Sequence, residues 1–227
     1  TKANAVELAA NPSTEKARPS TSLPAIGDIT KGQDTTHFSV VDAEGNRVAA
    51  NLSVNYPFGA VYAPPGTGVL INNEMDDFSA RPLTPNAYGL VGYKANAIAP
   101  LKRPLSSMTP TFIEAPGRIG VLGTPGGSRI ISMVLMGILS FHDGEGPEQW
   151  VAAKRYHHQY LPDEVQFEKN GLTAAEQADL VARGHALKEN SRNYGNMHAI
   201  ELDKQTGALH AASDPRGEGQ AEVFAVP

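Results

Sequence analysis

The chain has 227 residues, a formal net charge of −5 and no cysteine. Disulfides, thiolate zinc sites and a cysteine nucleophile are therefore excluded, and the negative charge provides no basic surface for nucleic acid or an anionic membrane. The longest apolar run, residues 130–139, is too short to cross a bilayer. A hydrophobic content of 41%, with 22 glycines and 17 prolines, predicts a globular chain with a buried core and many shaped turns.

The first 34 residues differ in composition from the rest of the chain. Residues 3–10 could form one or two helical turns, but the segment after them is rich in Pro, Ser, Thr and Gly and has little apolar periodicity. Strand-like patterns begin abruptly at Thr35. The composition therefore predicts a connector over 1–34 and a folded domain over 35–227.

Strand patterns dominate the first half of the folded domain. Residues 37–41 and 47–54 flank the sequence AEGN, which suits a tight turn, so they predict a β-hairpin. Further strands are predicted at 69–71, 111–115 and 119–122.

Helices and two more strands follow. An apolar helix is predicted over 128–141, and a second over 147–154 begins with proline at its favoured first position. Thr173 and Glu176 form a capping box for a third helix that ends at Gly184. Residues 197–202 and 208–212 are the last predicted strands. Strands, then helices, then strands indicate an α+β layered sandwich.

Thr35 is the first candidate for chemistry. A threonine hydroxyl needs a base, and the residue's own α-amine can serve if Thr35 is a chain terminus. This requires cleavage of the Asp34–Thr35 bond, where the composition changes. On spacing alone, a β-branched residue filling a strand is the alternative.

The sequence GTPGGSR, residues 123–129, lies between a predicted strand and a predicted helix. Its Gly126 and Gly127 amides could bind an anion or a developing oxyanion near the helix N-terminus, although a plain turn is the simpler interpretation. The sequence lacks the Gly-Lys-Ser/Thr of a phosphate-binding Walker loop.

Three further groups of polar residues are candidates with less specific signals. The acidic segment 72–80 could hold an amine or a metal, or it could be solvated. Ser106 and Ser107 could hydrogen-bond a carboxylate, but serine pairs are common in turns and this pair alone is not specific. His157 and His158 are neighbours whose rings point apart, so we expect structural hydrogen bonds from them and no shared metal.

The order of these motifs resembles the small subunit of the γ-glutamyltransferases, also called γ-glutamyl transpeptidases. The matching segments are TTHFSVVD, SVN, INNEMDDFSA, PNAYGLVG, KRPLSSMTPT, GTPGGSRII, RYHHQYLPDE and AASDPR. The family belongs to the N-terminal nucleophile hydrolases, which fold as an αββα four-layer sandwich, and its precursor cleaves itself before the first threonine of TTH. The resemblance thus implies a large-subunit tail over 1–34, cleavage between Asp34 and Thr35, and a catalytic small subunit over 35–227.

Carried over residue by residue, the resemblance makes Thr35 the nucleophile and Ser53, where the family usually has threonine, the residue that orients its amine. Thr36 could hydrogen-bond the Thr35 hydroxyl, and His37 would be structural. The resemblance assigns the other positions as follows: the donor α-amine to Asn55, Glu74 and Asp77, the donor α-carboxylate to Ser106 and Ser107, the oxyanion hole to Gly126 and Gly127, and a gating tyrosine to Tyr88 within a lid-like segment, 82–93.

The implied activity is γ-glutamyl transfer and hydrolysis on glutathione and other γ-glutamyl compounds, through an acyl-threonine and without a metal or organic cofactor. The acceptor would be water, an amino acid or a peptide. The implied partner is the large subunit of the same precursor, which supplies an arginine for the donor carboxylate, and the implied location is periplasmic or secreted. The alternatives are a related amidase, cephalosporin acylase-like or oxamate amidohydrolase-like, and a non-catalytic module. Retention of both substrate clamps argues against the amidase.

Overall fold

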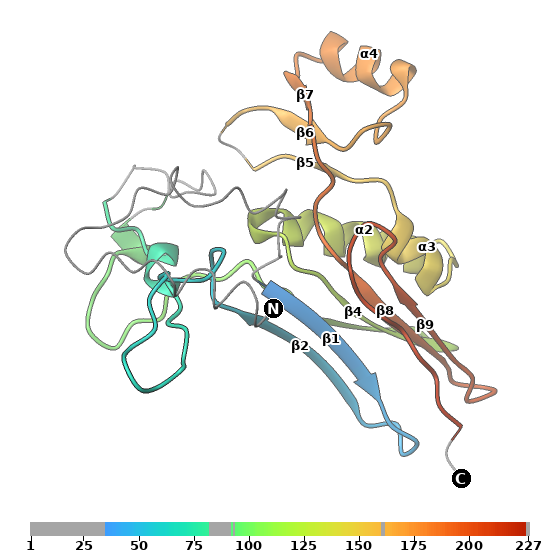
Figure 1. The fold of residues 1–227 in the computed structure, drawn as a ribbon. Helices are drawn as coiled ribbons and strands as arrows, with labels where there is room; N and C mark the ends of the chain where they lie inside the picture. The colour runs from blue at the N-terminus through green and yellow to red at the C-terminus, as the bar shows by residue number, and fades with distance from the viewer. Residues whose placement is uncertain (1–34, 82–91, 93, 160–161, 226–227) are drawn as a thin grey trace, which may run out of the picture. The chain divides into compact units, whose positions relative to one another are not determined.

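The structure is a computed structural model, and it describes residues 35–81, 92, 94–159 and 162–225 (Figure 1). The predicted connector over 1–34, with its short helix, lies outside these residues, as do Asp34 and nearly all of the lid-like segment with Tyr88. Among the helices in the described ranges, none has the length and apolarity needed to cross a membrane.

The predicted hairpin is confirmed as two antiparallel strands, β1 (Thr35–Val41) and β2 (Arg47–Ser53). The Asp42 carboxylate accepts hydrogen bonds from the backbone amides of Glu44 and Asn46, at 2.9 and 2.8 Å, and these bonds stabilise the turn. The register pairs Thr35 with Ser53. Because side chains alternate across a strand, these two residues point to the same face.

A four-stranded antiparallel sheet packs against the hairpin, in the order β3 (Thr111–Glu114), β4 (Arg118–Gly123), β8 (His198–Asp203) and β9 (Leu209–Ser213). Helices α2 (Ile130–His142) and α3 (Pro147–Ala152) cover one face of it. A Cβ added at Gly120 of β4 would meet Phe141 and Trp150, whereas one at Gly123 would meet His37 of the hairpin. Helices and hairpin therefore occupy opposite faces, which gives three successive layers, helix, sheet and hairpin.

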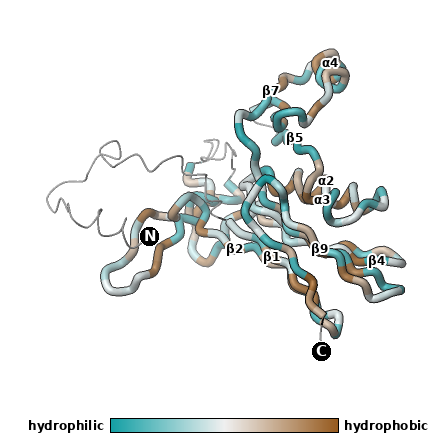
Figure 2. The backbone as a smooth tube through the Cα atoms, turned by 45° about the vertical axis from the view of Figure 1, so that its right-hand side comes forward, coloured by the Kyte–Doolittle hydropathy of each residue, from teal (hydrophilic) through white to brown (hydrophobic). Residues whose placement is uncertain are grey.

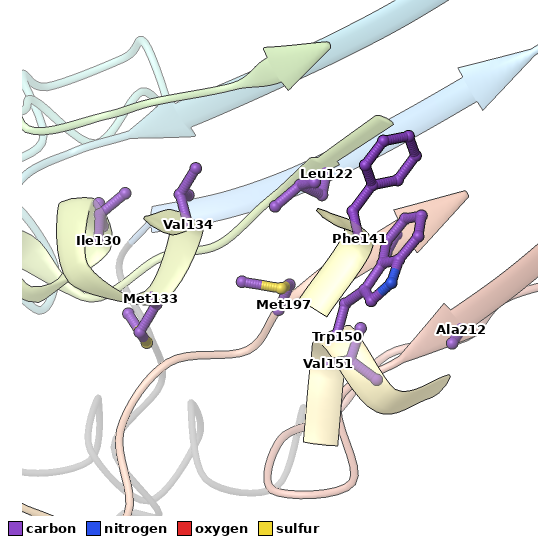
Figure 3. Packing of buried hydrophobic residues seen from close by; sticks show 10 residues of the cluster. Leu122, Ile130, Met133, Val134, Phe141, Trp150, Val151, Met197 and Ala212 are labelled. Atoms are coloured by element: carbon purple, nitrogen blue, oxygen red, sulfur yellow. The ribbon is translucent and has the colours of Figure 1, made fainter. Parts of the chain in front are cut away.

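The hydrophobic core lies between the sheet and the two helices (Figure 3). Leu122 of β4 and Met197, just before β8, face α2, while the Phe141 and Trp150 rings meet edge to face with centroids 5.5 Å apart. Trp150 also donates from its indole nitrogen to the Glu145 carbonyl at 2.9 Å. Truncating a buried tryptophan of this kind costs about 3 to 5 kcal/mol, so this side chain contributes strongly to the packing of α3 on the sheet.

A smaller sheet and one more helix complete the described part. Strands β5 (Tyr156–His157), β6 (Val165–Phe167) and β7 (Leu187–Glu189) pair in that order, and α4 (Ala174–Ala182) connects β6 to β7. The predicted capping box is confirmed, since Thr173 Oγ1 accepts from the Glu176 amide and the Glu176 carboxylate accepts from the Thr173 amide. Three short 3-10 helices are η2 (Glu74–Asp77), η3 (Lys94–Asn96) and η4 (Gly127–Arg129).

The prediction of a strand at 69–71 is wrong. These residues form an exposed loop that folds back on residues 60–62, with Ala60 N donating to Ile71 O and Ile71 N to Tyr62 O. The short strands β5, β6 and β7 were not predicted, because two or three residues are too few to show a period. The second helix ends at Ala152, earlier than expected. The apolar helix predicted over 128–141 begins as the short 3-10 helix η4 and continues as α2 to His142.

A buried ion cluster joins the end of β9 to Arg155, between α3 and β5, and to Glu168, just after β6. The Asp214 carboxylate pairs with Arg155 and accepts from the Met197 amide at 3.0 Å. Arg216 pairs with Glu168 at 2.7 Å. Each charge has an opposite charge and further hydrogen bonds, and burial without such partners would be costly. The AASDPR segment is therefore structural in this part of the chain.

Apolar side chains are exposed on the outer face of the hairpin and along one side of α2. Figure 2 shows hydrophobic residues along the hairpin strands. The exposed members are Phe38, Val40, Val48 and Leu52 on the hairpin and Ile131, Leu135 and Leu139 on α2. The sequence correctly predicted a helix apolar on nearly every side, but only one side of it packs on the sheet within the described residues.

Candidate active site

The predicted nucleophile lies at the first residue of β1. Thr35 Oγ1 is 2.8 Å from Ser53 Oγ, which belongs to the last residue of β2 and accepts from the Asn55 amide at 2.9 Å. We expected Ser53 to orient the Thr35 amine; the bond that the structure describes is to the hydroxyl. The strand register thus brings together two hydroxyls that are 18 residues apart in the sequence.

Thr36 does not take the role that the sequence suggested. It pairs with Leu52, and both lie on the exposed outer face of the hairpin, opposite to Thr35 and Ser53. Adjacent strand residues point to opposite faces, so the Thr36 side chain is directed away from the Thr35 hydroxyl.

Asn55 connects the hairpin to the acidic segment. Its backbone has φ 72°, a left-handed conformation that asparagine tolerates better than most residues, and its side chain is buried. Its Nδ2 donates to the Asn73 carbonyl at 3.1 Å, immediately before η2. This bond ties the end of β2 to the helix that presents Glu74 and Asp77.

Two carboxylates of η2, those of Glu74 and Asp77, face the same cavity. Burial, followed by the neighbouring Glu74 carboxylate, raises the pKa of Asp77 to about 6. Each of these causes disfavours the charged form of Asp77, and a bound cation would offset both by stabilising that form. The pair is therefore suited to an ammonium group.

The serine pair lies in the extended segment between η3 and β3. Asn96 positions this segment, because its Oδ1 accepts from the Leu105 amide at 3.0 Å while its Nδ2 donates to the Asp77 carbonyl at 2.7 Å. One side chain thus links the acidic helix to Ser106 and Ser107. No pattern in the sequence pointed to Asn96, because its two partners are distant along the chain.

The glycine turn between β4 and α2 has the backbone that the sequence indicated. Gly126 has φ 148° and Gly127 has φ 60°, both in regions that side chains disfavour. A Cβ at Gly126 would lie 2.5 Å from Met133 Cε, so the Met133 side chain already occupies the space that a side chain at position 126 would need. From there η4 begins and leads directly into α2.

One cavity gathers most of the predicted site residues. Its lining consists of Thr35, Ser53, Asn55, Glu74, Asp77, Ser106, Ser107, Met108, Gly127, Ser128 and Ile130. Carboxylates, serine hydroxyls, a glycine turn and the Thr35–Ser53 pair thus surround a single space. Gly126 is adjacent to it through Gly127, and Tyr88 and Asp34 lie outside the described residues.

The histidines make the structural hydrogen bonds that we expected. His157 contacts Ser132 Oγ at 2.6 Å and Gln159 Oε1 at 2.8 Å, and Gln159 Oε1 also accepts from Ser128 in the cavity wall. His158 has a different partner, Asp163, at 2.9 Å on the surface. The two imidazole rings therefore hydrogen-bond to different residues.

Comparison with known proteins places the chain in a class and then in a family. A threonine-headed hairpin stacked on a helix-covered sheet is the arrangement of N-terminal nucleophile hydrolases. Residues 1–224 match the sequence profile described as Gamma-glutamyltranspeptidase, and the chain therefore belongs to the γ-glutamyltranspeptidase family.

Individual relatives agree with this assignment. The chain is 43% identical over 210 residues to the glutathione hydrolase proenzyme of Pseudomonas aeruginosa, covering 91% of the chain and 36% of that protein. For the proenzyme of Escherichia coli K12 the identity is 44% over 220 residues, with coverages of 95% and 37%. The chain thus spans little more than a third of the length of these relatives.

Solved structures give the same result. The γ-glutamyltranspeptidase of Pseudomonas nitroreducens complexed with L-DON superposes with a TM-score of 0.76 at 43% identity, covering 84% of this chain and all of that one. The cephalosporin acylase of Bacillus halodurans, from one of the alternative classes, reaches a TM-score of 0.67 at 23% identity, with coverages of 84% and 34%. That likeness shows a shared fold alone.

Proposed function

We propose that this chain is the catalytic part of a γ-glutamyltransferase precursor that cleaves itself at Asp34–Thr35 and then transfers γ-glutamyl groups through Thr35. The observation that carries the proposal is the cavity in which the Thr35–Ser53 hydroxyl pair lies among two carboxylates, two serines and a glycine turn. These groups match an α-amine, an α-carboxylate and a reacting carbonyl, which are the two ends and the centre of a γ-glutamyl donor.

The chemistry begins with the free Thr35 terminus. Its amine, with an ordinary pKa of about 7.7 to 8.0, takes the hydroxyl proton while Thr35 Oγ1 attacks the γ-carbonyl of glutathione or a similar donor. The Gly126 and Gly127 amides stabilise the oxyanion. The amine then returns the proton to the leaving amine, and an acyl-threonine ester remains. Water attacks this ester in hydrolysis, and an amino acid or peptide attacks it in transpeptidation.

The partner in this proposal is the large subunit of the same precursor, to which residues 1–34 belong as its C-terminal tail. The exposed apolar side chains on the hairpin and on α2 support a partner of this kind, because apolar side chains grouped on one exposed face often mark an interface. Covering the outer face of the hairpin would complete an αββα sandwich.

We further propose a periplasmic or secreted location, which fractionation of the source cells would test.

The proposed activity is tested with the full-length precursor. Intact-mass spectrometry is expected to find two chains, the smaller beginning at Thr35, and the processed protein is expected to release aniline from γ-glutamyl anilide. The N-acetylated anilide, which has no ammonium group, is the matched substrate control and is expected to react poorly. An uncleaved, inactive wild type would refute the proposal, and a processed protein that prefers the acetylated anilide would identify another amidase.

The role of Asp77 predicts a distinctive pH profile. Asp77 must be ionised to hold an ammonium group, so protonation below its pKa of about 6 weakens donor binding. The Thr35 amine must be neutral to act as a base, so kcat/KM falls already below about pH 7.7. We expect log kcat/KM to rise with pH with a slope of about 2 below pH 6 and about 1 above it, up to the amine pKa.

The variant Asp77→Asn keeps the size of the side chain and removes the charge. We expect its kcat/KM at pH 7 to fall about thirtyfold, mainly through KM, and its profile to keep a slope of about 1 throughout the acidic range. A slope of 2 that persists in the variant would assign the lower pKa to another group. Asp76→Asn, on the same helix, is the matched control, because the Asp76 carboxylate accepts from the Tyr56 hydroxyl and does not line the cavity.

A further inference from the structure

Behind the Thr35–Ser53 pair, the next inward-facing pair of the hairpin consists of His37 and Asn51. Asn51 bridges two elements, since its Oδ1 is 2.8 Å from His37 Nδ1 and its Nδ2 donates to the Thr124 carbonyl at 3.1 Å. A carbonyl only accepts, so the amide nitrogen must face Thr124. The oxygen then faces His37, whose proton must be on Nδ1, and His37 Nε2 accepts from the Ser39 hydroxyl at 2.9 Å.

Thr124 directly follows Gly123, the last residue of β4, and begins the glycine turn. It is fully buried and held on both sides, since its Oγ1 accepts from the Asn196 amide at 3.1 Å while its carbonyl accepts from Asn51. Pro125 and Gly126 follow it directly. Small shifts of the Thr124 peptide are therefore transmitted to the Gly126 and Gly127 amides.

The close approach of hairpin and sheet depends on Gly123. A Cβ at this position would lie 2.3 Å from His37 Nδ1, so the imidazole ring occupies the space that a side chain would fill. The ring is buried, and this burial lowers the pKa of His37 and keeps it neutral. A neutral ring with its single proton on Nδ1 satisfies both of its hydrogen bonds.

We infer that Asn51 is a positioning residue for acyl transfer, which fixes the distance between the Thr35 hydroxyl and the oxyanion-binding amides of Gly126 and Gly127. The inference rests on the proposed function. The nucleophile and the oxyanion turn lie on different layers, the hairpin and the sheet. Asn51 lies one inward pair away from Thr35 on the hairpin, and its hydrogen-bond partner Thr124 lies two residues before Gly126. Asn51 does not line the cavity, so it acts through the turn.

Asn51→Asp is the most specific test, because it keeps an acceptor for His37 and replaces the donor to Thr124 by an oxygen that repels the carbonyl. In the processed full-length enzyme, we expect kcat for γ-glutamyl anilide to fall about tenfold with little change in KM, since geometry is disturbed and the substrate clamps are not. Asn51→Ala removes both hydrogen bonds without adding charge and is expected to give a similar loss.

Ser39→Ala is the matched control, because it deletes the other hydrogen bond of His37 and leaves the Asn51–Thr124 contact in place. We expect its kcat to remain within about twofold of the wild type. The affinity for a γ-boronate analogue of glutamate, which forms a tetrahedral adduct with the nucleophile, should fall about tenfold in the Asn51 variants, while the affinity for glutamate is retained.

The outcomes separate this inference from the proposed function. An active wild type whose Asn51 variants keep full kcat and boronate affinity would overturn the inference alone. Equal losses of boronate and glutamate affinity would also overturn it, because they indicate a general loss of structure. If Asn51→Asp does not fold, the alanine variant decides by the same measurements. A wild type that neither processes nor turns over the anilide would overturn both.

Discussion

Thr35→Ala is expected to abolish processing and γ-glutamyl turnover together, because the same hydroxyl performs both attacks in the proposed mechanism. Removing a nucleophile lowers kcat by about 10⁶-fold in well-studied hydrolases, which places the variant below ordinary detection. The fold should survive, since Thr35 contributes one hydrogen bond at the edge of a hairpin whose other backbone pairs remain. Intact-mass spectrometry and anilide turnover on the purified full-length variant are the measurements.

Thr36→Ala provides the matched control for this prediction. It removes an identical side chain from the adjacent position, but on the opposite face of the hairpin. Normal processing and near-normal turnover are expected. Loss of activity in Thr36→Ala would show that the hairpin end itself is fragile, and a cleaved Thr35→Ala precursor would assign the nucleophile elsewhere.

Local signals in the sequence were sufficient for the hairpin and for α4. The hairpin turn has Gly45 at φ 85°, and Asp42 caps the turn amides, so the chemistry that closes it lies within a few residues. The capping box is equally local, with donor and acceptor three residues apart. Such features depend on neighbouring residues and can be predicted without knowing the fold.

The strand predicted at 69–71 failed because apolar character is not specific to strands. Val69, Leu70 and Ile71 are β-branched or apolar, yet all of them are exposed in an irregular loop. The same ambiguity affects the exposed side of α2, where Leu135 and Leu139 make the helix look buried all round. In the 69–71 loop and on α2, these apolar residues form exposed surface that no other described part of the chain covers.

The same contrast between local signals and distant contacts applies to the candidate site. The motifs, read together with the family resemblance, predicted most residues of the cavity lining, since carboxylates, paired serines and paired glycines are recognisable in short segments. The residues that hold these motifs together were missed, because their partners are distant in sequence. Asn96 joins the acidic helix to the serine segment, and Asn51 reaches Thr124, 73 residues away. A single asparagine in a strand carries no sign of such a contact.

Gly126→Ala is expected to lower kcat by about 10² to 10³-fold, the usual cost of losing an oxyanion donor. Two physical causes act in the same direction. The backbone at φ 148° is unfavourable for any residue with a side chain, and the added Cβ would lie 2.5 Å from Met133 Cε. The turn must therefore change conformation, and the Gly126 and Gly127 amides move with it. Single-turnover acylation of the processed enzyme measures the effect without interference from product release.

The two causes can be separated with Met133→Ala, alone and combined with Gly126→Ala. If the steric clash with Met133 dominated, the double variant would recover the activity of Met133→Ala. We expect no recovery, because the backbone angle remains unfavourable when the space is provided. Gly117→Ala, in a turn of the same sheet where a Cβ meets nothing within 4 Å, is the matched control and should retain full activity. Full recovery in the double variant would show that the turn tolerates alanine and that space alone requires glycine at position 126.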